Sequence, residues 1–176
     1  MFNRKKYEQD AVNLYRSTNA AILSTMSKKY EGYPFGSFIT YATDRSRTLF
    51  MYTSDIAQHT KNLKNDSKAC VTLFKLDTEY DKQNSSRLTL MGDLKKVPDK
   101  IYESCKDRFH NFFPESKVYE QMHDFNFYQI SVTQARWIGG FGKISWLDPK
   151  NWMNVGIDWI NSEKAMIDHM NNDHLN

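Results

Sequence analysis

The stretch from Gly32 to Phe74 restricts what this chain of 176 residues can fold into more than any other part of it. Two short runs of aromatic, apolar and β-branched residues, at 38–42 and 49–52, lie on either side of a polar segment rich in turn-forming residues. Such runs are typical of strands, and the short polar connection between them predicts a β-hairpin. The centre of the chain is therefore expected to be a sheet.

A helix and a further strand are expected directly after this hairpin. Apolar residues recur at helical spacing up to Leu63, and Ser54 and Asp55 both have the side chain of an N-cap residue. Polar residues at 65–67 end the helix, and the apolar run at 69–74 resumes the strand pattern. The order of strand, strand, helix and strand indicates a mixed α and β fold.

The flanking residues extend the same alternation of helices and strands. A glycine inside a strand indicates a bulge or the close approach of another backbone, so Gly92 predicts one of these in its strand. The sequence pattern predicts helices at 4–18, from Pro98 to Pro114 and at 116–122, strands at 20–26, 87–94 and 125–135, and a loop at 77–86.

Composition and charge narrow the class of protein. The length suits one domain, and a net charge of +3 with basic residues scattered among acids argues against nucleic acid as a partner. No apolar run approaches the roughly 20 residues of a membrane span, which argues against a membrane partner. The first ten residues lack the apolar segment of a secretion signal, so we expect a cytoplasmic protein. Cys70 and Cys105 have no second cysteine at metal-binding spacing and are expected to be inert thiols.

Two motifs give the chain a family resemblance. One is the glycine-rich run at 135–143, which begins Ala, Arg, Trp and ends Gly, Gly, Phe, Gly, Lys. The other comprises Gly32, Pro34, Ser37, Tyr41, Ala42, Ile56, Ala57, His59, Thr60, Lys61, Asn62 and Leu63. Both motifs resemble those of the haem-utilisation branch, of the HugZ and HutZ type, within the flavin-binding split-barrel superfamily that includes the pyridoxamine 5'-phosphate oxidases.

The resemblance implies a fold, an assembly and a cofactor. We expect an α+β protein with a six-stranded antiparallel split β-barrel and flanking helices at 1–150, followed by a C-terminal helical extension at 151–176. The resemblance also implies a homodimer whose cofactor crevices lie between the subunits. Haem is the expected cofactor and flavin mononucleotide (FMN) is the alternative. A third possibility is a non-catalytic binding module that keeps the barrel without a redox cofactor.

FMN binding requires a grip on the phosphate, which cations provide best. In the pyridoxamine phosphate oxidases, an Arg and Lys pair opens the helix after the hairpin and an Arg starts the preceding strand. Here the corresponding residues are Gln58, His59 and Ser37, and Lys61 is a partial replacement. This weakens the case for FMN. The candidate neutral donors are Thr53, Ser54, Thr60 and Asn62.

Haem requires an apolar slot, cations for its propionates and a nitrogen or sulfur ligand for its iron. The resemblance places the iron ligand at a histidine near the C-terminus, where this chain has His169 and His174. His59 is a further candidate, either as a propionate donor or as a ligand. Arg136 and Lys143 are the candidate propionate cations, although Arg136 is equally well explained as a salt-bridged strand residue. The oxidoreductase activity of such a site would be oxygen-dependent opening of the haem ring.

Overall fold

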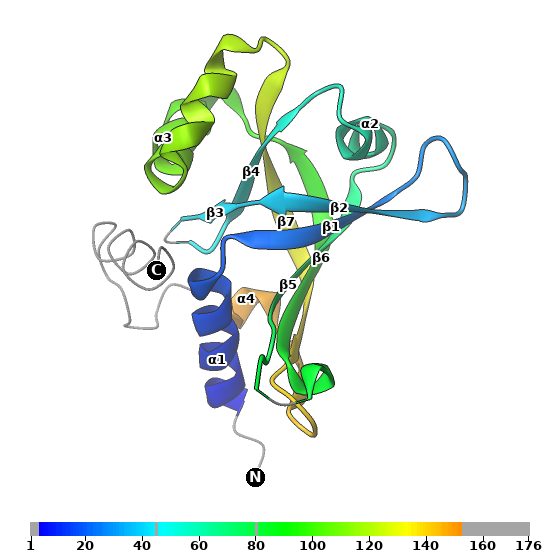
Figure 1. Ribbon diagram of the computed structural model, residues 1–176, viewed down its shortest axis with the longest axis vertical. Coiled ribbons are helices and arrows are strands. Elements are labelled where there is room, and N and C mark those ends of the chain that lie inside the picture. The colour runs from blue at the N-terminus through cyan, green and yellow to red at the C-terminus, as the bar shows by residue number, and fades with distance from the viewer. Residues whose placement is uncertain (1–3, 45, 80, 153–176) are drawn as a thin grey trace.

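The computed structural model describes residues 4–44, 46–79 and 81–152 as an α+β fold with one curled antiparallel sheet (Figure 1). The helices and strands expected between residues 4 and 135 are found, with ends that differ by a few residues, and the expected loop at 77–86 contains the short η1. The C-terminal helical extension expected at 151–176 lies outside the described residues beyond Trp152. The elements are α1 (Arg4–Ser17), β1 (Ala20–Met26), β2 (Pro34–Thr40), β3 (Ala42–Thr43), β4 (Leu49–Ser54), α2 (Gln58–Asn65), β5 (Lys68–Lys75), η1 (Lys82–Asn84), β6 (Ser86–Lys96), α3 (Asp99–Phe112), η2 (Pro114–Gln121), β7 (Phe125–Ile138), β8 (Ile144–Leu147) and α4 (Pro149–Trp152).

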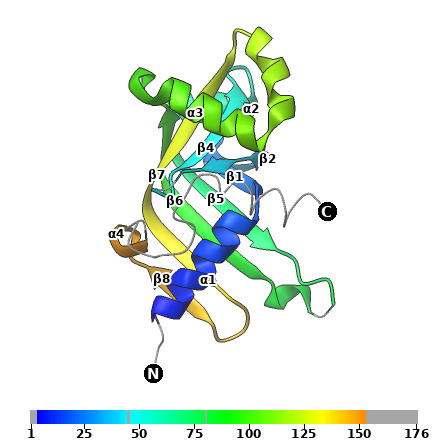
Figure 2. The same cartoon turned by 90° about the vertical axis from the view of Figure 1, so that its left-hand side faces the viewer.

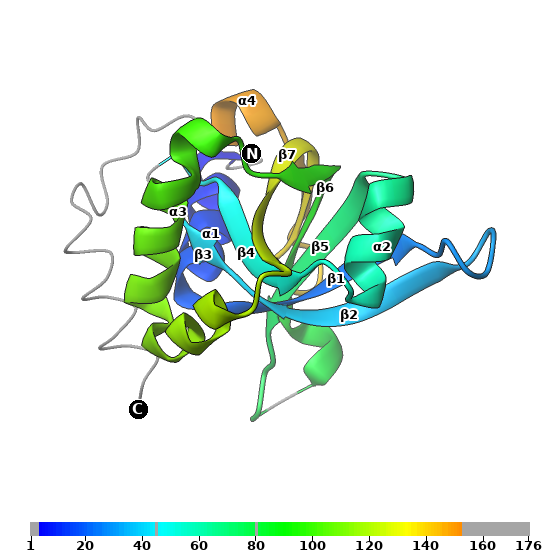
Figure 3. The same cartoon turned by 90° about the horizontal axis from the view of Figure 1, so that it is seen from above.

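The sheet curls on itself because one bent strand forms both of its ends. The strands run in the order β2, β1, β5, β6, β7, β4, β3, and β8 pairs with β7. Only Tyr41 separates β2 from β3, so the strand that pairs with β1 continues on to pair with β4. If β2 and β3 are taken together, the six expected strands are present in the described residues and β8 is an addition. The expected split barrel is confirmed, and Figure 3 shows the sheet curling between α3 and α2.

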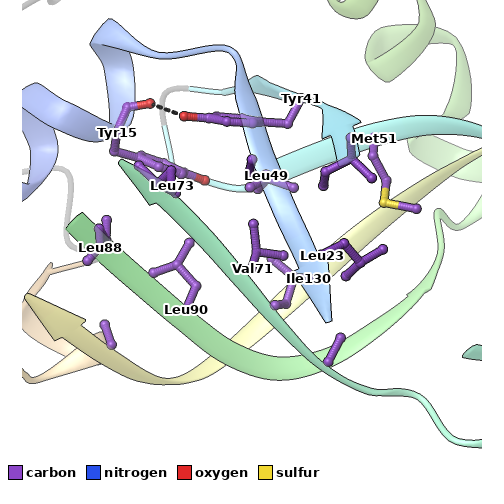
Figure 4. Packing of buried hydrophobic residues seen from close by; sticks show 14 of the residues in the cluster. Tyr15, Leu23, Tyr41, Leu49, Met51, Val71, Leu73, Leu88, Leu90 and Ile130 are labelled. Carbon is purple, nitrogen blue, oxygen red and sulfur yellow. Dashed lines mark hydrogen bonds between the residues drawn. The ribbon is translucent and has the colours of Figure 1, made fainter. Parts of the chain in front are cut away.

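The expected hairpin between the runs at 38–42 and 49–52 is much shorter than the sequence indicates. Only two residue pairs join β3 to β4, because most of β2 pairs with β1 instead. Tyr41 holds the bend between β2 and β3: its ring is buried and stacks on Tyr15 of α1 with 5.8 Å between ring centres. Its hydroxyl donates to the main-chain carbonyl of Tyr15 over 3.0 Å (Figure 4).

The hydrophobic core fills the inside of the curled sheet. Alternate residues along each strand point inward, and Leu23, Val71, Leu73, Leu88 and Leu90 are completely buried (Figure 4). Full burial of each such side chain contributes about 1.5–3 kcal/mol relative to an exposed one. The same alternation turns the intervening residues of β1, β5 and β6 to the outside of the barrel, where they form the outer face of the sheet.

Helices cover the barrel on several sides. α1 packs against β5, β6 and β8, and α3 lies above it on the same side of the molecule (Figure 2). α3 buries Phe109 in an aromatic cluster with Phe127 and Tyr52. α2 packs against β1 and β2. Within the described ranges, no helix is long and apolar enough to cross a membrane.

The sequence predicts Ser54 or Asp55 as the N-cap residue of α2, and this prediction is wrong. The residue before the helix is Ala57, which makes no side-chain capping bond. Both polar side chains are engaged with the segment around β7 instead. Ser54 donates a hydrogen bond to the carboxylate of Asp124, and Asp55 accepts one from the hydroxyl of Tyr128 over 2.9 Å.

The irregularity predicted at Gly92 is confirmed. The pairing of β6 with β7 shifts its register between Met91 and Gly92. A Cβ atom on Gly92 would lie 2.0 Å from the carbonyl oxygen of Ser131, so the backbones approach too closely for any side chain. Both features that a strand glycine indicates, a bulge and a close approach, are present at this one residue.

Candidate functional site

The residues of the first motif gather where β4 meets the start of α2. The hydroxyl of Thr53 lies 2.7 Å from Nε2 of His59, and both side chains are largely shielded from water. Burial lowers the pKa of the His59 imidazole below its ordinary value. Burial therefore disfavours the charged imidazolium that would hold a phosphate, and His59 is a hydrogen-bonding partner of Thr53 in this structure.

Two carboxylates lie close to the same point of the chain. Asp124 accepts the hydrogen bond of Ser54, and Asp55 forms an ion pair with Lys64 over 3.2 Å. Burial acts to raise the pKa of Asp55, but the hydrogen bond from Tyr128 and the contact with Lys64 together lower it, so Asp55 is ionised. The ion pair with Lys64 balances this charge, so the ammonium of Lys64 is already engaged by a carboxylate.

Thr60 and Asn62 are turned into the protein. Both are completely buried, and Oγ1 of Thr60 has no hydrogen-bond partner. The amide of Asn62 donates to Oγ1 of Thr25 and accepts from the main-chain N–H of Lys28, each over 3.0 Å. Asn62 thereby ties α2 to β1. Lys61, in contrast, is exposed.

Ser37 lies on β2, opposite Leu23 of β1. Cross-strand partners share a face of the sheet, and Leu23 is completely buried. Ser37 is therefore on the inward face of its strand.

A second group of side chains forms a row across the outer face of the sheet. The strand register aligns one residue from each of six strands, and we call this row the outer band: Phe38, Ile22, Thr72, Thr89, Arg136 and Trp146. Phe38 and Trp146 are 70% and 53% exposed. The guanidinium of Arg136 lies 4.9 Å from the centre of a ring of Trp146, which places a cation over an indole. The band thus combines exposed apolar side chains with one positive charge.

A cleft of about 480 Å³ lies beside the outer band, and we call it the outer cleft. The next row of outward residues includes Gly36 and Ser24, whose small size leaves the outer face hollow there. Three sulfur-containing side chains line the cleft: Met26, Cys70 and Met91. Of the two cysteines expected to be inert, Cys105 is buried, whereas Cys70 is only partly buried and faces the cleft.

Lys143 lies elsewhere, in the turn between β7 and β8. This turn needs glycine, since Gly140 and Gly142 have φ values of +109° and +72°. Together with Lys75, Lys143 lines a cavity of about 560 Å³ between α1 and the end of the barrel. Figure 1 shows this turn and α2 at opposite ends of the barrel, so one subunit does not bring Lys143 together with His59.

The expected iron ligands, His169 and His174, lie outside the described residues. In the part of the chain that is described, no group of three or more His, Cys, Asp or Glu side chains is arranged to hold a metal ion. His110 is buried between α3 and η2, with Nδ1 2.7 Å from the hydroxyl of Ser116. It is therefore a structural histidine.

Sequence reasoning missed the outer band and the outer cleft. Their signal is present in the sequence, because the outward positions of β1 carry Ile22 and Met26 where a solvated strand would carry charges. The residues that complete the band come from distant strands, however, and only the register aligns them with β1.

The sequence matches one family and one curated relative. A family model described as CREG, beta-barrel, matches residues 3–154. A non-canonical heme oxygenase, HOZ, from the chloroplast of Arabidopsis thaliana is 30% identical over 158 residues, which cover 87% of this chain and 48% of that protein. The chain therefore spans about half the length of this relative.

The fold matches solved structures. A heme-binding protein from Mycobacterium smegmatis superposes with a TM-score of 0.76 at 25% identity, over 84% of this chain and 60% of that one. HutZ, a heme storage protein from Vibrio cholerae, gives a TM-score of 0.59 at 19% identity, over 74% and 83%. A protein of the pyridoxinephosphate oxidase family from Clostridium acetobutylicum gives 0.64 at 14% identity, over 84% and 98%. The last two show that the fold is shared.

Proposed function

We propose that this chain, which belongs to the CREG beta-barrel family, is a haem-utilisation protein that binds haem between two copies of its barrel. The observation that carries the proposal is the outer band, in which the exposed apolar side chains of Phe38, Ile22 and Trp146 flank two threonines and a single cation. The names of the Arabidopsis relative and of the Mycobacterium protein both refer to heme, which supports the choice of ligand.

A second copy of the chain is the proposed cover for the outer band. On the adjoining row of the outer face, Phe74 and Ile144 are each 40% exposed, and Arg87 and Ile138 lie between them. Exposed apolar side chains gathered on one face are typical of interaction sites. Two such faces packed together would leave the outer cleft at the edge of the interface, which supports a crevice for a flat ligand there.

Haem suits this surface better than FMN does. At the start of α2, where an FMN phosphate needs cations, burial disfavours the charged form of His59 and a carboxylate already engages Lys64. Arg136 on the outer band is instead placed for a propionate, and Lys143 remains a second candidate. His169 or His174 would supply the nitrogen ligand to iron, and the bound haem would supply iron-centred redox chemistry.

Haem titration of the purified protein tests the ligand. We expect a Soret band that saturates, and an affinity about tenfold weaker in Arg136→Ala, because a hydrogen bond to a charged group contributes about 1.5–3 kcal/mol. Lys117→Ala is the matched control, since Lys117 is an exposed cation on η2 that has no proposed role in binding. His169→Ala and His174→Ala identify the iron ligand by a change in the position of the band. A protein that binds FMN but does not bind haem would refute the proposal.

Sedimentation velocity tests the assembly. Phe38→Asp places a charge in the outer band and is expected to convert a dimer into a monomer. Ile56→Asp is the control, because Ile56 is 69% exposed but precedes α2 and is not part of the band. A wild-type protein that stays monomeric at tens of micromolar, or a Phe38→Asp variant that stays dimeric, would contradict the assignment of this interface.

Oxygen-dependent opening of the haem ring is the activity to test on the loaded protein. The electrons it needs must come from an added reductant such as ascorbate. Loss of the Soret band under air but not under nitrogen, blocked in the variant that loses the iron ligand, would support turnover. A band that is stable in both atmospheres would indicate a binding protein.

A further inference from the structure

Three sulfur-containing side chains from three neighbouring strands line the outer cleft. Cys70 of β5 pairs directly with Met91 of β6, so their side chains stand next to each other on the same face. Ser24 of β1 pairs with Cys70 on its other side, and Met26 lies two residues along β1 on that face. All three side chains line the one cavity. They lie 21 or more positions apart in sequence, and only the sheet register brings them together.

We propose that the outer cleft is a binding site for Cu(I), with the Cys70 thiolate and the thioethers of Met26 and Met91 as ligands. Thiolate and thioether sulfurs are soft ligands that select Cu(I) over harder divalent cations. Methionine has three rotatable bonds, so both thioethers can turn toward the thiol from opposite sides without a change in the backbone. Met26 is 39% exposed and Cys70 only partly buried, so the ion can reach them.

Charge also favours a monovalent ion. One thiolate and two neutral thioethers around Cu(I) give a neutral centre, whereas Zn²⁺ would leave a net positive charge. The charged groups at the rim of the cleft already have partners: Lys68 pairs with Asp66 over 3.6 Å, and Asp93 accepts a hydrogen bond from Ser67 over 2.5 Å. Among its described lining residues, Asp93 is the one carboxylate, and Ser67 holds one of its oxygens, whereas three side chains supply soft sulfur donors.

The other cysteine shows what distinguishes Cys70. Cys105 is buried in α3, and burial raises the pKa of its thiol to about 11, so it remains protonated. Because the thiolate is the metal ligand, the buried thiol of Cys105 is a poor ligand by comparison.

Competition for Cu(I) against a chromogenic chelator such as bicinchoninate, under nitrogen, tests the site on haem-free protein. We expect one Cu(I) per chain, and no binding of Zn²⁺ at the same concentration. Cys70→Ser should remove the site, and Met26→Leu and Met91→Leu should each weaken it at least tenfold. Met122→Leu and Cys105→Ala are the matched controls, because Met122 is an exposed thioether outside the cleft.

The pattern across the variants decides the outcome. An affinity lost in Cys70→Ser but unchanged in both methionine variants would reveal an ordinary surface thiol and overturn the three-sulfur site. Binding of Cu(I) that survives in Cys70→Ser would overturn it as well. Since occupancy is measured without haem, neither result depends on the proposed haem function, and failure to bind haem would leave this test intact.

Discussion

Replacing Gly92 by alanine is expected to open the barrel between β6 and β7. The new Cβ would lie 2.0 Å from the carbonyl oxygen of Ser131, whereas ordinary contacts begin at 3.4 Å, and the atom it meets is backbone. The two strands must therefore move apart locally and stretch the hydrogen bonds on either side of the bulge. Loss of two or three such bonds, with one buried group left unpaired, is expected to cost about 3–5 kcal/mol. Gly36→Ala is the matched control, because the nearest atom to its Cβ is Ile22 Cγ2 at 4.0 Å.

Thermal and urea unfolding followed by circular dichroism measure both effects. For a protein of this size, 1 kcal/mol shifts Tm by about 2–4 °C, so Gly92→Ala should lower Tm by roughly 6–20 °C. Gly36→Ala should leave Tm unchanged or raise it slightly, because replacing a strand glycine by alanine restricts the unfolded chain and contributes about 0.4–1 kcal/mol. A Gly92→Ala protein within 1 kcal/mol of wild type would refute the reasoning, since it would show that the bulge accepts a side chain by a small adjustment.

Two further substitutions test the polar interior. Burial lowers the pKa of His110 from 6.5, although the nearby Glu120 opposes this shift. The unfolded chain therefore binds a proton more readily than the folded one. Unfolding becomes easier as the pH falls from about 7 to 5. In His110→Gln, the unfolding free energy measured in urea should decrease less steeply as the pH falls from about 7 to 5. Equal pH dependences in the variant and the wild type would contradict this reasoning. Tyr41→Phe leaves the carbonyl of Tyr15 without its donor and should lower the unfolding free energy by about 1–3 kcal/mol. A smaller loss than in Tyr15→Phe, whose hydroxyl donates to the Arg47 carbonyl, would show that the bend does not need this bond.

Features that depend on neighbouring residues could be predicted from the sequence. The strand at 20–26 has the bounds of β1, and the helix at 4–18 differs from α1 by one residue, because alternation and helical spacing are local patterns. The irregularity at Gly92 was predictable for the same reason, because a glycine weakens a regular strand and is often found at a bulge or a close backbone approach. Family resemblance supplied the barrel itself, which these local patterns do not determine.

The arrangement of the candidate site could not be predicted in the same way. Arg136 lies over Trp146 only because β8 folds back on β7, and a capping role for Ser54 failed because Asp124, seventy residues later, binds its hydroxyl. Thr60 and Asn62 are candidate neutral donors from the sequence, yet the packing of α2 on β1 buries both. Each of these outcomes depends on contacts between segments that are distant in the chain.

The bent strand that joins both ends of the sheet also determines when the protein can finish folding. β4 has only two residue pairs with β3, and its long partner is β7, where Phe50 meets Gln129. A chain emerging from the ribosome therefore cannot seal the barrel until β7 has left the exit tunnel, and the inward side chains of the earlier strands stay uncovered during that interval. Slow, late closure and a need for protection by chaperones during synthesis follow from the topology.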